Sequence, residues 1–170
     1  MAKVLYFIIG AVFFLSMSSC LEKEEFPDEP VIKFMSIEEK GNELELKFSF
    51  TDGDGNFGLE AGDTLSPFDS DPYQQNLIVS YYELQNGEWQ RFGQDFPSFS
   101  PFYIDVAYGQ RVPLVEPTGQ REVQEGEVTY DIVGYYNENS PFDTARFEFF
   151  IYDRSLNASN VEVTSFFIKP

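Results

Sequence analysis

Residues 43–50 read Glu43-Leu44-Glu45-Leu46-Lys47-Phe48-Ser49-Phe50. Apolar and polar side chains alternate along this stretch, which gives a period of two residues. Successive side chains of a β-strand point to opposite faces of its sheet. The stretch therefore predicts a strand with one face in a hydrophobic core and the other in water.

The same alternation recurs on both sides of this strand. It predicts further strands over 31–37, 77–84, 88–92, 123–133, 145–152 and 161–168. Asn86-Gly87 lies between two of these runs, and both residues tolerate the positive φ of a type I′ turn, so a hairpin is expected there. No window of helical length has apolar residues spaced three and four apart.

These strands predict an all-β protein with one domain over 31–170, an antiparallel immunoglobulin-like sandwich of about seven to eight strands. Residues 152–160, with Asp153 and Asn157, resemble the last hairpin of bacterial immunoglobulin-like domains. Residues 50–59 resemble a segment of uncharacterised Bacteroidota lipoproteins. The chain has one cysteine, which excludes the disulfide-linked core of antibody domains.

The N-terminus has the pattern of a secretory signal peptide. Lys3 precedes an apolar run over 4–15, too short to span a bilayer, and small residues lead to Cys20. Residues 1–19 resemble a bacterial lipoprotein signal, with Met17 where that pattern has Leu, Val or Ile. The resemblance implies cleavage before Cys20 and lipidation of its thiol. The alternative is an ordinary signal that leaves Cys20 as a free thiol in an oxidising compartment.

Residues 20–30 form an acidic segment that no hydrophobic core could absorb. Lys23-Glu24-Glu25 resembles the export signal of Bacteroidota lipoproteins on the outer face of the outer membrane. This resemblance implies a surface-exposed protein held in the outer membrane by its lipid. The alternative is a solvated tether with no address in it.

Charge and composition exclude several functions. Residues 20–170 hold all 29 acidic side chains and ten of the 11 basic ones, a net charge of −19. Such a chain repels nucleic acid, so no nucleic-acid partner is expected. The chain has no histidine, which removes the usual ligands of zinc, copper and haem and the base of Ser-His catalysis. Calcium, which prefers oxygen ligands, remains the candidate cofactor.

One loop has the spacing of a calcium site. In a twelve-residue calcium loop the first, third, fifth, ninth and twelfth places would hold Asp52, Asp54, Asn56, Glu60 and Asp63, with the Gly58 carbonyl at the seventh. Phe57 stands where such loops have glycine. The alternative is a glycine-rich loop whose Asp and Asn side chains bond their own backbone. Asp153 and Asn157 would add ligands if their hairpin lies at the same end of the sandwich.

An aromatic group is the second candidate site. Its members are Trp89, Phe99, Phe102 and Tyr103, in and beside a stretch interrupted by prolines. Such rings stack on sugars or contact a partner protein. The alternative is that they fill the core of a chain with 19 phenylalanines.

The sequence thus predicts a lipid-anchored, non-catalytic binding or accessory protein of the cell envelope, with an outer-membrane or extracellular protein as partner. No pair of acids stands out as catalytic, so an enzyme is not expected. Two alternatives remain, a carbohydrate-binding accessory of a glycan-uptake system and a calcium-dependent adhesion domain.

Overall fold

The computed structural model describes residues 26–70, 72–92, 108–115, 123–136 and 138–170. The regular elements in these ranges are β-strands, and no helix occurs among them. They are β1 (Val31–Lys40), β2 (Glu43–Asp52), β3 (Leu77–Gln85), β4 (Glu88–Arg91), β5 (Gln124–Val133), β6 (Thr144–Ile151), β7 (Glu162–Val163) and β8 (Phe167–Ile168).

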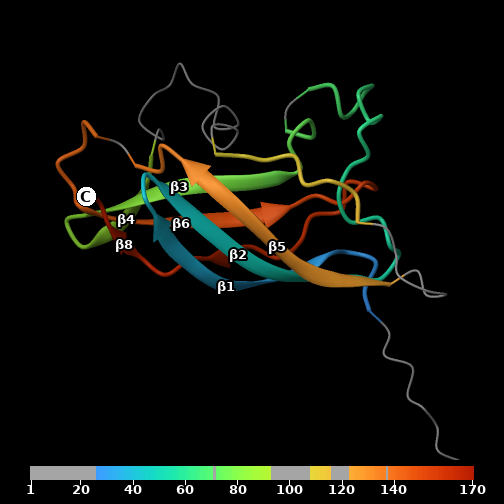
Figure 1. Ribbon diagram of the computed structural model, residues 1–170, viewed down its shortest axis with the longest axis horizontal. Helices are drawn as coiled ribbons and strands as arrows, with labels where there is room; N and C mark the ends of the chain where they lie inside the picture. The colour runs from blue at the N-terminus through green and yellow to red at the C-terminus, as the bar shows by residue number, and fades with distance from the viewer. Residues whose placement is uncertain (1–25, 71, 93–107, 116–122, 137) are drawn as a thin grey trace, which may run out of the picture.

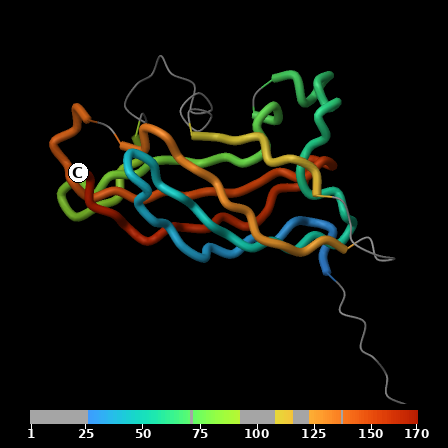
Figure 2. Tube along the Cα trace, viewed as in Figure 1, coloured from blue at the N-terminus to red at the C-terminus, as the bar shows by residue number. Residues whose placement is uncertain are grey.

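The strands form two sheets that pack face to face (Figures 1 and 2). One sheet has the order β1-β2-β5, and the other has the order β4-β3-β6-β7 with β8 also paired to β6. Every strand pairing within them is antiparallel. The arrangement is that of a β-sandwich, and the all-β prediction is confirmed.

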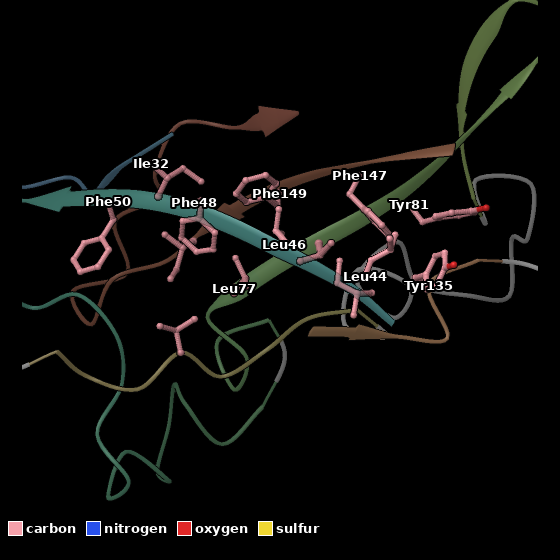
Figure 3. Close-up of a cluster of buried hydrophobic side chains, with 14 of the residues drawn as sticks. Ile32, Leu44, Leu46, Phe48, Phe50, Leu77, Tyr81, Tyr135, Phe147 and Phe149 are labelled. Carbon is pink, nitrogen blue, oxygen red and sulfur yellow. The ribbon is translucent and has the colours of Figure 1, made fainter. Parts of the chain in front are cut away.

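The core lies between β2 of one sheet and β3 and β6 of the other (Figure 3). On β2 the inward side chains are at most 3% exposed, and they are Leu44, Leu46, Phe48 and Phe50. Phe48 meets Phe149 of β6 with ring centroids 5.3 Å apart. Burial of each such side chain stabilises the fold by about 1.5–3 kcal/mol, so the alternation along β2 determines which face is inside.

The hairpin predicted at Asn86-Gly87 is confirmed. The backbone φ is 54° at Asn86 and 88° at Gly87, the left-handed conformation that a type I′ turn needs at both central positions. It joins β3 to β4, whose register pairs Gln85 with Glu88.

The strand predicted over 161–168 is instead divided into β7 and β8. Thr164 lies between them and is buried. Its hydroxyl accepts the Phe147 N–H at 3.0 Å, while its own N–H donates to the Phe147 carbonyl at 2.9 Å. A side-chain oxygen thus replaces a ladder carbonyl, which interrupts the strand.

Side chains from the segment around β7 cover the outer edge of β1. The Asn160 amide accepts the Ile32 N–H and donates to the Ile32 carbonyl, both at 2.9 Å. The Glu162 carboxylate accepts the Phe34 N–H at 2.9 Å. These contacts join the two sheets along one side.

One end of the sandwich gathers several loops. β2 ends at Asp52, β5 begins beside it at Gln124, and β6 ends at Ile151. The segment that leads into β1 arrives at the same end, on the right in Figure 1. The loops after β2 and after β6 are therefore neighbours although they lie far apart in sequence.

Candidate metal centre

Asp52 is an acid in a core position. It continues the inward series of β2 after Phe50, pairs with Gln124 of β5, and is 0% exposed. A buried carboxylate requires hydrogen bonds or a cation to offset its lost hydration. Its surroundings therefore decide what this end of the sandwich can do.

Three carboxylates converge around this position. One carboxylate oxygen each from Asp52, Asp54 and Asp153 lie within 4.8 Å of one another. Asp153 is also 0% exposed and comes from the loop after β6. The group thus joins a residue at the end of one sheet to a residue at the end of the other.

The cluster contains buried oxygens that lack hydrogen-bond partners. Within the described part of the chain, these atoms are Asp52 Oδ2, Asp54 Oδ1 and Asn56 Oδ1. Asp52 Oδ1 accepts the Gly55 N–H at 3.2 Å, so only half of this carboxylate is satisfied. The Asn56 amide nitrogen donates to Asp54 Oδ2 at 2.6 Å and to Ser155 Oγ at 3.0 Å. Unpaired buried oxygens are uncommon in folded proteins and call for a bound ion or water.

The loop after β2 is held in place by Gln124. This side chain is 3% exposed, donates to the Gly55 carbonyl at 2.9 Å and accepts the Phe57 N–H at 2.9 Å. Phe57 is itself buried and stacks on Phe50 with ring centroids 3.7 Å apart. The residue that departs from the glycine of a calcium loop is thus a core residue that fixes the loop to the sandwich.

The loop after β6 is fixed through Asp153. Its Oδ1 accepts the Asn157 N–H at 2.7 Å, and its Oδ2 accepts the Asn157 amide at 2.8 Å. The backbone N–H of Ser155 also hydrogen-bonds to this carboxylate. Asn157 therefore orients the Asp153 carboxylate.

Burial and like charge raise the proton affinity of the cluster. Burial raises the pKa of Asp52 to about 7, and the neighbouring Asp54 carboxyl and the Asp153 charge act in the same direction. Burial likewise raises the pKa of Asp153, opposed by its hydrogen bonds from Asn157. Without a cation, the Asp52 carboxyl would therefore be partly protonated near neutral pH.

Two predicted ligands form ion pairs with one arginine. The Arg154 guanidinium pairs with Glu60 at 2.6 Å and with Asp63 at 3.0 Å. The structure thus brings Asp52, Asp54 and Asn56 together, adds Asp153, and places Glu60 and Asp63 in ion pairs. Sequence spacing could not predict these ion pairs, because Arg154 lies in a different loop from Glu60 and Asp63.

The aromatic candidates are described in part. Trp89 lies on β4 on the face away from the core, with the Arg146 guanidinium 4.5 Å from the centre of its ring. Phe99, Phe102 and Tyr103 lie outside the described residues, as does Cys20. No helix in the described part of the chain is long and apolar enough to cross a bilayer.

The donor set of the cluster suits one class of ion. Carboxylate and amide oxygens are hard ligands, which calcium and magnesium prefer over softer metals. Oxygens that bind calcium at 2.3–2.6 Å lie up to about 5 Å apart across the ion, a span that matches this group.

Comparisons with protein-family models, curated proteins and solved structures found no match.

Proposed function

We propose that this protein is a non-catalytic binding domain of the cell envelope, anchored by lipid at Cys20 and stabilised by calcium. The calcium site would consist of Asp52, Asp54, Asn56 and Asp153. We include an immunoglobulin-like topology in the proposal, which two antiparallel sheets packed face to face support.

The observation that carries the calcium site is the unpaired Oδ2 of the fully buried Asp52. It lies among two further carboxylates, while the nearby Arg154 is engaged by Glu60 and Asp63. Concentrating acids in a buried place destabilises the fold unless a cation neutralises them. A divalent ion offsets both the repulsion and the lost hydration at once.

Four protein oxygens suit calcium better than magnesium. Calcium takes six to eight oxygens in flexible geometry, so waters or backbone carbonyls fill the remaining positions. Magnesium requires near-ideal octahedral geometry and gives up its water reluctantly. We therefore expect calcium to bind more tightly than magnesium.

The proposal is tested by titrating calcium into chelator-treated protein and following both heat and thermal unfolding. At a hundred times its dissociation constant, calcium should stabilise the fold by about 2.7 kcal/mol. For a domain of this size the melting temperature should rise by about 5–10 °C. Magnesium at the same concentration should give a smaller rise.

Two variants make the test specific. Asp153→Asn removes a charged ligand but keeps the size of the side chain, so it should abolish most of the calcium response. Asp131→Asn, an exposed acid toward the other end of β5, is the matched control and should respond like the natural chain. If calcium does not change the melting temperature of the natural chain, or changes it equally in both variants, the proposed calcium site is wrong.

A further inference from the structure

The residue between two of the proposed ligands touches the segment that enters the sandwich. Gly53 donates its N–H to the Pro27 carbonyl at 2.9 Å. A Cβ on Gly53 would lie 2.4 Å from the carbonyl oxygens of both Phe26 and Pro27, so the two backbones pack without room for a side chain. Figure 2 shows the two segments together at the right-hand end.

Residues 26–29 are attached to the sandwich by fewer contacts than the start of the strand that follows them. Pro30 is buried, Val31 pairs with Thr51 in the β1–β2 ladder, and both backbone groups of Ile32 bond to Asn160. Asp28 and Glu29 are exposed. In the part of the chain that the structure describes, the backbone hydrogen bond that holds 26–29 is the one from Gly53.

Two of the clustered carboxylates flank Gly53 in the sequence. Without a cation, Asp52 and Asp54 repel each other and Asp153 across a few ångströms in a buried place. A bound cation would attract all three carboxylates and hold the side chains on both sides of Gly53 around one point. The Gly53 N–H would then keep its hydrogen bond to the Pro27 carbonyl.

We infer that calcium at this centre fixes residues 26–29 to the sandwich and so sets the length of the tether that runs to Cys20. The inference rests on the proposed calcium site and gives that site a mechanical role. With calcium bound, the tether begins at Phe26. When calcium is lost, it begins at the buried Pro30.

The greatest possible distance between Cys20 and the first fixed residue of the sandwich would change substantially. Six residue steps separate Cys20 from Phe26 and span at most about 20 Å, whereas the ten steps to Pro30 span at most about 34 Å. Calcium would therefore hold the domain close to its lipid anchor, and calcium depletion would let it stand further from the membrane. The regulated quantity is the distance from the membrane at which the domain meets a partner.

A spin label at position 28 tests this inference. The label is placed by Asp28→Cys in the full chain carrying Cys20→Ser, so that one thiol is present. Its rotational correlation time should be about threefold longer in calcium than in chelator, because a pinned backbone damps nanosecond motion. A label introduced by Glu88→Cys, on the exposed part of β4, is the control and should not respond.

Calcium binding is measured on the same samples by calorimetry, which separates the two proposals. If calcium binds and the label at 28 moves equally with and without it, the tether inference is wrong and the calcium site stands. If calcium does not bind, both fail. Adding Asp153→Asn should keep the label mobile in calcium, and a label that still becomes immobile would also contradict the inference.

Discussion

At the scale of single residues, Asp52 is buried because the alternation of β2 places its side chain on the inward face. The register that buries Phe48 and Phe50 also buries the next residue on that face. Burial raises its pKa from 3.8 to about 7, since the charged form loses hydration and faces the Asp54 and Asp153 carboxylates.

This pKa shift predicts how the stability of the calcium-free protein depends on pH. The folded state binds the Asp52 proton more tightly than the unfolded state, so protonation favours folding. The free energy of unfolding should rise as pH falls through about 7 toward 3.8, by on the order of 2–4 kcal/mol from this group. Thermal unfolding in chelator between pH 8 and pH 5 measures it.

Asp52→Asn isolates the contribution, because other acids also titrate in this strongly acidic chain. The variant should be more stable than the natural chain at pH 8 and should show a shallower pH dependence. In saturating calcium the natural chain should lose the effect, since the ion requires deprotonated carboxylates. Parallel pH profiles for the two proteins would contradict the assignment.

At the scale of elements, the turn of the β3–β4 hairpin requires a left-handed backbone at both of its central residues. Gly87 has a φ of 88°, and a Cβ there would meet no atom within 4 Å. Gly87→Ala should therefore lower the free energy of unfolding by about 1–2 kcal/mol through backbone strain without a steric clash. Gly62 is equally open but lacks a positive φ, so Gly62→Ala should change stability by less than about 0.5 kcal/mol. Denaturant unfolding distinguishes the two, and equal effects would show that φ is not the cause.

The elements also show what the sequence could and could not predict. Strands with long alternation, such as β2 and β6, follow from their own residues because period two fixes both the strand and its buried face. The division between β7 and β8 could not be foreseen, since it depends on a bond between Thr164 and a distant strand.

The grouping of the candidate ligands could likewise be predicted only in part from the sequence. Spacing grouped Asp52, Asp54 and Asn56 as candidate ligands because they share one loop. The place of Asp153 beside them depends on which ends of β2 and β6 meet, and local patterns carry no such information. For the same reason Glu60 and Asp63 fitted a calcium loop by spacing, although Arg154 from another loop pairs with both.

At the scale of the whole molecule, the proposed anchor predicts where the protein is found in a cell. Blocking lipoprotein signal cleavage should leave an unprocessed precursor, and Cys20→Ser should abolish incorporation of labelled palmitate. The natural chain should then partition with membranes and the variant should not, because acyl chains contribute about 0.8 kcal/mol per buried methylene. Membrane partition that survives Cys20→Ser would contradict lipid anchoring.

The covering of β1 has a consequence for how copies of this protein meet one another. An open sheet edge offers its N–H and C=O groups to any strand that arrives, including that of an identical neighbour. Here the Asn160 amide bonds both backbone groups of Ile32, and the Glu162 carboxylate bonds the Phe34 N–H. A neighbouring copy would have to displace these bonds and approach a carboxylate before it could add a strand. Two side chains thus give this edge a barrier to self-association.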